Sequence, residues 1–212
     1  MHDFIQVLLV DDHAVVREGY RRLLEPCLDL RVCGEASDYD SLLLQIQQHT
    51  VQVVVMDVAL PGTSGIEITR RLKLRHPELG ILISSMYDDA IFPARALEAG
   101  ALGYVTKASP AGLLIEGIRR VARGQRYLSP DVAQALALRD GALGPTQALS
   151  PREFEVLRLL VAGHGLERIA QLVSLSPKTV ANYQSSIKQK LGVDSPTQLL
   201  RAAAALGLPT AS

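Results

Sequence analysis

The first 123 residues alternate between short continuous apolar runs and longer stretches in which apolar residues recur every three or four positions. The runs are "VLLV", "RVCGEA", "VQVVVM", "GILIS" and "ALGYVT", and the longer stretches include "AVVREGYRRLLE" and "SPAGLLIEGIRRVARG". A short apolar run bounded by turn residues indicates a strand buried on both faces, whereas the longer spacing indicates a helix. Five strands alternating with five helices predict an α/β fold, a doubly wound five-stranded parallel sheet with right-handed crossovers.

Residues 148–212 contain no strand-like run and predict a small all-α domain. Ser150 precedes a proline and stands three residues before Glu153, which is the pattern of a helix that opens with a capping box. "LERIAQLV" predicts a second helix, "SPKTVANYQSSIKQKLG" a third from Ser176 to Gly192, and "SPTQLLRAAAALG" a fourth from Ser195 to Gly207.

Residues 124–147 differ from both flanking regions, because turn residues at each end enclose only one short helix-like piece. We interpret this stretch as an interdomain linker. The predicted domains are therefore residues 1–123 and residues 148–212.

Composition and charge indicate a globular protein with a basic second domain. Hydrophobic residues make up 48% of the 212 positions and charged residues 21%, which is typical of globular domains. No apolar stretch is long enough to span a membrane, and the amino terminus lacks a basic segment, so we expect a cytoplasmic protein without a membrane partner. Cys27 and Cys33 lack the spacing of a metal site, so we expect both to be reduced thiols.

The charge is distributed unevenly along the chain. Residues 1–123 hold 13 Lys and Arg against 16 Asp and Glu, whereas residues 148–212 hold seven against four, so the second domain is suited to approach a polyanion.

Polar residues with specific chemistry follow the predicted strands. Asp11 and Asp12 follow "VLLV" and Asp57 follows "VVVM", so the three carboxylates share the carboxyl edge of the sheet, where ligands bind in this architecture. Hard oxygen donors of this kind suit an octahedral Mg²⁺ ion. Ser85 and Lys107 end two further strands, and a hydroxyl and an ammonium beside a metal-bound carboxylate are what a transferred phosphoryl group requires.

The motifs "VDDH", "MDVALPGTSG", "ISSMYDD" and "GYVTK" in this order resemble the receiver domain of bacterial two-component response regulators, which has a flavodoxin-like fold. The resemblance implies that Asp57 is the phosphoacceptor and that Mg²⁺ is required. It further implies a cation bound directly by Asp12, through water by Asp11, and by the backbone carbonyl of Ala59.

The same resemblance assigns Ser85 to a phosphoryl oxygen and Lys107 to the aspartyl phosphate. Tyr104 is expected to change rotamer when Ser85 moves. Many receivers have Lys-Pro where this chain has Lys107-Ala108, and the sequence leaves the geometry of that peptide open.

The second domain resembles the LuxR-type helix-turn-helix domain through "LSPREFEVLRLLVAG", "IAQLVSLSPKTVANY" and "KQKLGV", and its pairing with a receiver resembles the NarL/FixJ family. We expect the first turn of the recognition helix to hold phosphates, its middle to face base edges and its later lysines to lie near the backbone. The expected DNA-binding residues are Lys178, Thr179, Asn182, Tyr183, Ser185, Ser186, Lys188 and Lys190. Many relatives have a basic residue at Ala181 and a histidine at Tyr183, so base preference does not transfer from the family; Lys190 is equally explained as a surface charge.

These features predict a DNA-binding transcriptional response regulator that is not an enzyme, in which a sensor histidine kinase phosphorylates Asp57. Its predicted partners are that kinase and double-stranded promoter DNA. The modest charge predicts a homodimer when phosphorylated, and the small-residue face of the fourth helix either forms that dimer or is ordinary core. Three alternatives stay open: a phosphorylation-independent (orphan) regulator whose receiver is an interaction platform, a metal-dependent phosphohydrolase, and a helical domain that binds protein.

Overall fold

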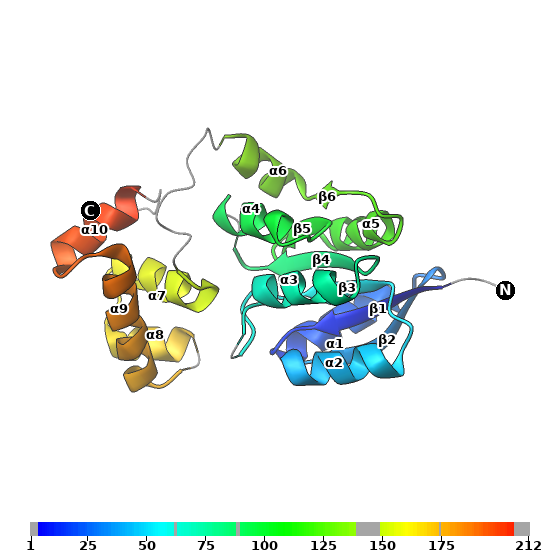
Figure 1. The fold of residues 1–212 in the computed structure, drawn as a ribbon, viewed down its shortest axis with the longest axis horizontal. Helices are drawn as coiled ribbons and strands as arrows, with labels where there is room; N and C mark the ends of the chain where they lie inside the picture. Colours follow the sequence, from blue (N-terminus) through cyan, green and yellow to red (C-terminus); the bar gives the residue numbers. More distant parts are fainter. Residues whose placement is uncertain (1–3, 62, 88–89, 139–148, 174, 206–212) are drawn as a thin grey trace. The chain divides into compact units, whose positions relative to one another are not determined.

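A computed structural model describes residues 4–205 of the chain, apart from residues 62, 88–89, 139–148 and 174 (Figure 1). Its contacts divide the chain into two units, residues 1–140 and residues 141–212. Within the described part of the chain, no helix is both long enough and apolar enough to cross a membrane.

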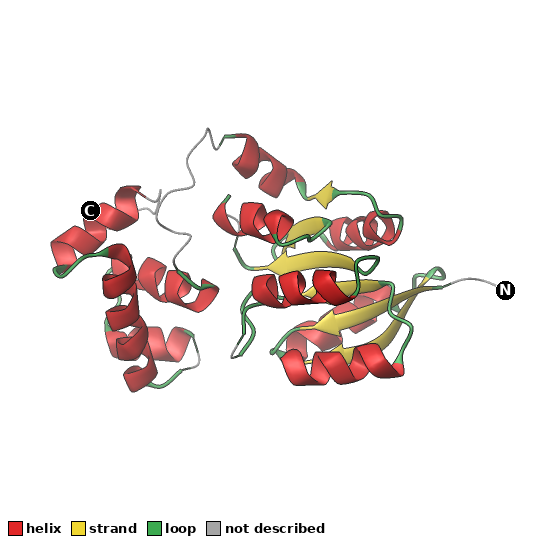
Figure 2. Ribbon diagram, viewed as in Figure 1, coloured by secondary structure: helices red, strands yellow, loops and turns green. Residues whose placement is uncertain are grey.

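The first unit is a doubly wound parallel sheet, as the apolar pattern predicts. Its strands lie in the order β2-β1-β3-β4-β5-β6, and every neighbouring pair is parallel. The strands are β1 (Ile5–Val10), β2 (Leu30–Ala36), β3 (Val53–Met56), β4 (Gly80–Ser85), β5 (Gly103–Thr106) and β6 (Tyr127–Leu128). The helices are α1 (Ala14–Leu24), α2 (Tyr39–Gln48), α3 (Gly65–Arg75), α4 (Ile91–Glu98), α5 (Ala111–Ala122) and α6 (Pro130–Ala137). Helices cover both faces of this sheet (Figure 2).

One face of the sheet packs against α1 and α5. Val7, Val55 and Leu82 of the strands are at most 2% exposed and cluster with Leu24 of α1 and Ile118 of α5. Apolar side chains on every central strand are buried in this way, which explains why the strands appear in the sequence as continuous apolar runs.

The sheet has six strands where the sequence predicts five, and the extra strand comes from the predicted linker. Tyr127 of β6 is the register partner of Gly103, and Leu128 is that of Tyr104. The helix α6 that follows packs against α4 and β5. A two-residue strand has no periodicity of its own and forms here because it pairs with the outer edge of β5. The first unit therefore extends beyond the predicted boundary at residue 123, and residues 139–147 of the predicted linker lie outside the described part.

The second unit is helical, with α7 (Pro151–Val161), α8 (Leu166–Leu172), α9 (Pro177–Leu191) and α10 (Pro196–Ala205). The predicted capping box between Ser150 and Glu153 is present, and Ser176 caps α9. Gly192 ends α9 with φ at +65°, the left-handed conformation that favours glycine. The predicted stop at Gly207 lies outside the described residues.

The small-residue face of α10 is packed within its own unit. Leu199 is 5% exposed and Ala203 is fully buried, and α10 contacts α7 and α9. These contacts favour the interpretation of this face as ordinary core.

Candidate functional site

The parallel strands bring the predicted carboxylates together at their carboxyl ends. Asp57 continues β3, where its N–H donates to the carbonyl of Val10 at 2.8 Å, and Asp11 continues β1. The two residues are only 3% and 2% exposed. Ligand atoms of Asp11, Asp12, His13 and Asp57 all lie within 4.8 Å of one another. The carboxyl edge of the sheet therefore carries a dense acidic cluster.

Lys107 follows β5 and reaches into this cluster. Its Nζ lies 2.6 Å from Oδ2 of Asp11 and 3.1 Å from Oδ2 of Asp57, and its side chain is 10% exposed. Its backbone N–H donates to the carbonyl of Ser85 at 2.7 Å, which ties the ends of β4 and β5 together. The Lys107–Ala108 peptide is trans, since the described residues contain no cis peptide bond.

Asp57 and Lys107 influence each other's pKa. Burial raises the pKa of Asp57, and the charge of Asp11 raises it further, while Lys107 and the backbone N–H of Ala59 oppose the rise. Burial alone would lower the pKa of Lys107, but Asp57 and Asp11 together raise it. Lys107 therefore remains a cation that balances the two most buried carboxylates.

The donor set fits a hard divalent cation. Three carboxylates converge within 4.8 Å, and oxygen donors are the ligands that Mg²⁺ prefers. The structure also brings in His13, which is not among the predicted metal-site residues. Its Nδ1 lies 2.7 Å from Oδ1 of Asp12 and 3.3 Å from Oδ1 of Asp11. Its position directly after the Asp pair was the available signal.

Ser85 and Tyr104 lie inside the protein near the ends of β4 and β5, and both are fully buried. The hydroxyl of Ser85 accepts a hydrogen bond from the N–H of Tyr87 at 3.3 Å. Tyr104 points inward, and its hydroxyl donates to the carbonyl of Tyr87 at 2.9 Å. The ring of Tyr87 stacks on Phe92 of α4 with centroids 4.3 Å apart. Tyr87 thus links both predicted switch residues to α4, a contact across chain segments that the sequence does not reveal.

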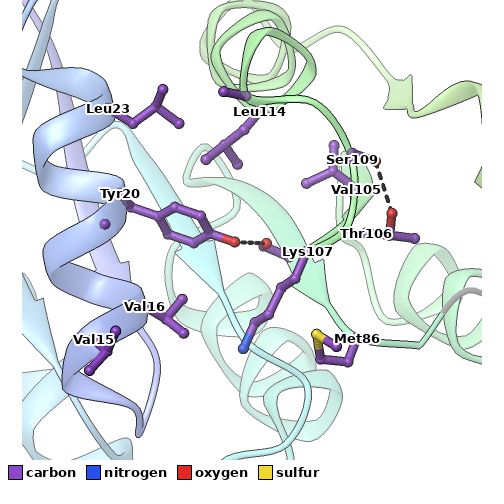
Figure 3. Close-up of a pocket in the computed structure, with 13 residues that line it drawn as sticks. Val15, Val16, Tyr20, Leu23, Met86, Val105, Thr106, Lys107, Ser109 and Leu114 are labelled. Atoms are coloured by element: carbon purple, nitrogen blue, oxygen red, sulfur yellow. Dashed lines mark hydrogen bonds between the residues drawn. The ribbon is translucent and has the colours of Figure 1, made fainter.

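A groove of about 540 Å³ adjoins Lys107 between α1 and the segment after β5 (Figure 3). Figure 3 shows Tyr20 projecting from α1 across the groove, and its hydroxyl lies 2.6 Å from Oγ of Ser84. Val15 and Met86 line the groove and are 85% and 69% exposed. Exposed apolar side chains therefore lie beside a buried charged site.

In the second unit, the expected DNA-binding residues lie on different sides of α9. Lys178, Asn182 and Ser185 are exposed, and their spacing of four and three places them on one helix face. Gln189 is exposed on the same face, four residues after Ser185. Gln189 is not among the expected DNA-binding residues, although its seven-residue spacing from Asn182 was the available signal.

Ser186 and Lys190 instead contact α7. The hydroxyl of Ser186 donates to Oε1 of Glu153 at 2.6 Å, and Nζ of Lys190 lies 2.7 Å from Oε2. Glu153 is 4% exposed and also accepts from the N–H of Ser150 at 2.6 Å. Burial alone would raise the pKa of Glu153, but the bonds from Lys190, Ser186 and Ser150 lower it. These two side chains therefore hold α9 against α7.

The other expected contacts on α9 are partly covered or internally bonded. Thr179, Tyr183 and Lys188 are half-buried. The N–H of Thr179 donates to the capping hydroxyl of Ser176 at 3.1 Å. The hydroxyl of Ser185 donates to the carbonyl of Ala181 at 3.0 Å, so that hydroxyl already has one partner within its own helix.

Comparison with known proteins finds families that match both units of the chain. Residues 7–119 match the response regulator receiver domain family, and residues 147–203 match the LuxR family of bacterial regulatory proteins. The chain is 37% identical to the response regulator GacA of Pseudomonas protegens, over 98% of this chain and 99% of that protein. It is 35% identical to the response regulator UvrY of Escherichia coli, over 96% and 95%. The RcsB structure described as a complex with DNA matches with a TM-score of 0.62 and 27% identity, over 96% of this chain and all of that one. The chain belongs to the two-component response regulators that join a receiver domain to a LuxR-type DNA-binding domain.

Proposed function

We propose that Asp57 is the phosphoacceptor of this regulator and that its phosphorylation controls DNA binding. One observation carries the proposal: a carboxylate that is 3% exposed at the end of β3 lies beside two further carboxylates and within 3.1 Å of a lysine ammonium. A carboxylate oxygen of Asp57 attacks the phosphorus of a phosphohistidine on a sensor histidine kinase. The new O–P bond forms as the P–N bond breaks, and the imidazole leaves with the electron pair and takes up a proton.

The residues around Asp57 are suited to bind the transferred group. Lys107 exchanges its contact with Asp57 for one with a phosphoryl oxygen, and the Ser85 hydroxyl donates to another. Asp11, Asp12, Asp57 and the backbone carbonyl of Ala59 would hold Mg²⁺, which when bound neutralises charge on the phosphoryl oxygens. Tyr104 and Tyr87 then carry the change at Ser85 to α4 through their hydrogen bond and the stack on Phe92.

The groove beside Lys107 gives the kinase a place to approach. Apolar side chains such as Val15 and Met86 are exposed there, next to a site that a phosphohistidine must reach. Exposed apolar patches beside a functional site are typical of protein–protein contacts.

The exposed face of α9 is the proposed contact with double-stranded DNA. Lys178 in the first turn is suited to a phosphate, while the amides of Asn182 and Gln189 are suited to base edges. We assign Ser186 and Lys190 to bracing α9 rather than to DNA, because both bind Glu153. A structure of the similar protein RcsB is described as two dimers bound to two parallel DNAs, which supports a homodimer as the DNA-binding form here.

Phosphotransfer to the purified full chain tests this proposal. The protein is incubated with acetyl phosphate and Mg²⁺, and its intact mass is measured. We expect one added phosphoryl group on the wild type and none on Asp57→Asn. Asp29→Asn is the matched control, because Asp29 pairs with Arg119 before β2, at the opposite end of the sheet. A wild type that stays unmodified would contradict the proposal and favour a receiver that acts as an interaction platform.

A further inference from the structure

The segment after α5 is built into the receiver next to the phosphorylation site. β6 pairs with β5, and α6 rests on β5 and α4 (Figure 1). Val132 of α6 is fully buried, and Tyr127 of β6 is 7% exposed. In the chain, α6 is the last described helix before the DNA-binding unit. From α6 the chain continues to the DNA-binding unit, so α6 is the part of the receiver nearest to that unit in the sequence.

Specific hydrogen bonds hold the start of α6 to the end of β5. The hydroxyl of Thr106 donates to Oδ2 of Asp131 at 2.8 Å and lies 2.9 Å from the hydroxyl of Ser109. The N–H of Ser129 donates to the carbonyl of Tyr104 at 3.1 Å. Burial alone would raise the pKa of Asp131, but hydrogen bonds that include the one from Thr106 lower it, so its carboxylate is charged at neutral pH. A carboxylate in the first turn also stabilises the helix.

Thr106 is placed among the groups that bind the phosphoryl group in the proposed function. Lys107 is the next residue, and Ser85 is the register partner of Thr106 across the ladder. Tyr104 lies two positions earlier, on the same face of β5. When Lys107 and Ser85 move to bind a phosphoryl group, the backbone of Thr106 is affected through both neighbours. Lys107 is bonded to it in the chain, and Ser85 is its partner across the ladder.

We infer that the contact between Thr106 and Asp131 couples phosphorylation at Asp57 to the docking of α6. This inference rests on the proposed function of Asp57. When Ser85 and Lys107 hold the phosphoryl group, the end of β5 is fixed in one arrangement, and Thr106 then holds Asp131 more firmly. Phosphorylation thereby tightens α6 against β5 and α4, so α6 is the receiver's first output element.

Amide hydrogen exchange of α6 in the full chain measures this coupling. Exchange of residues 133–137 is compared before and after treatment with acetyl phosphate and Mg²⁺. In the wild type we expect exchange to slow by at least about five-fold, the lower end of typical coupling between sites. Asp131→Ala and Thr106→Val remove the same contact from opposite sides, and either variant should abolish the response. The double variant should behave like each single variant, because effects through one shared contact are not additive.

Two controls distinguish a failure of this inference from a failure of the proposed phosphorylation of Asp57. Asp29→Asn removes a carboxylate that pairs with Arg119 away from α6 and should keep the wild-type response. Intact mass is measured on every sample. A phosphorylated wild type with unchanged α6 exchange overturns the inference alone, as does a full response in either single variant. A wild type that takes no phosphoryl group overturns the proposed function and this inference with it. If Asp131→Ala does not fold, Thr106→Val decides the outcome.

Discussion

Replacing Lys107 with methionine is expected to destabilise the receiver unit in metal-free buffer. The substitution keeps an unbranched side chain but removes the ammonium that lies 2.6 Å from Asp11 and 3.1 Å from Asp57. The two carboxylates are 2% and 3% exposed, so water can solvate little of the negative charge that the ammonium no longer compensates. Removing one partner of a buried ion pair leaves an uncompensated charge.

The expected loss is about 3 kcal/mol, the lower end of the range for breaking a buried ion pair. The lower end applies because burial already raises the pKa of Asp57, so this carboxyl relieves part of the cost by taking up a proton. Mg²⁺ should raise the stability of the variant, since a cation at 100 times its dissociation constant adds about 2.7 kcal/mol to the folded form.

Urea unfolding monitored by near-ultraviolet tyrosine signals measures this loss. Five of the six tyrosines lie in residues 1–140, so the signal reports mainly the receiver unit. The double variant of Lys107→Met with Asp57→Asn is the matched control. It removes one of the two uncompensated charges and should be at least about 1 kcal/mol more stable than Lys107→Met alone.

Two results would refute this reasoning. One is a Lys107→Met protein whose stability stays within about 0.5 kcal/mol of the wild type, as for an ordinary surface substitution. The other is a double variant that is no more stable than the single variant, because the cost would then not arise from the carboxylate.

Three further predictions concern other parts of the chain. Glu153→Gln should destabilise the DNA-binding unit by about 1.5–3 kcal/mol, the range for hydrogen bonds to a charged group, in far-ultraviolet circular dichroism melts. Because the folded-state pKa of Glu153 is lowered, its stabilisation is present above the ordinary glutamate pKa of about 4.3 and is lost as pH falls through the folded value; an acid titration in which wild type and Glu153→Gln lose stability in parallel would contradict this. Gly65→Ala places a Cβ 1.9 Å from the backbone carbonyl of Asp57 and should cost about 1–3 kcal/mol in thermal unfolding; an unchanged melting temperature would show that the turn adapts freely. Lys178→Ala combined with Asn182→Ala should weaken binding to genomic DNA fragments, with Lys178→Ala alone reducing the salt slope by about 1, and unchanged binding would exclude this face of α9.

The sequence predicted features that depend on local chemistry. The apolar runs identified five of the six strands. Strands β3, β4 and β5 are buried along their whole length, and strands buried on both faces carry no polar alternation. The helix starts at Ser150 and Ser176 follow from capping side chains within three residues, and both caps are present. The meeting of Asp11, Asp57 and Lys107 followed from parallel topology, since each residue ends a strand.

What the sequence could not show depends on contacts between distant segments. β6 is two residues long and exists because it pairs with the edge of β5. Ser186 and Lys190 lie 33 and 37 residues from Glu153, so helix spacing alone placed them with the residues expected to contact DNA. The bond between Thr106 and Asp131 spans 25 residues and crosses the predicted domain boundary. In each case the structure depends on packing between distant segments, which the periodicity of apolar residues does not specify.

The most direct test of the central claim compares DNA affinity before and after phosphorylation of the same sample. Binding of the full chain to genomic DNA fragments is measured at one fixed salt concentration, with and without acetyl phosphate and Mg²⁺, for wild type and Asp57→Asn. We expect wild-type affinity to rise by at least about five-fold while that of Asp57→Asn does not change. An equal rise in both proteins, or no rise in a wild type whose intact mass shows the phosphoryl group, would contradict it.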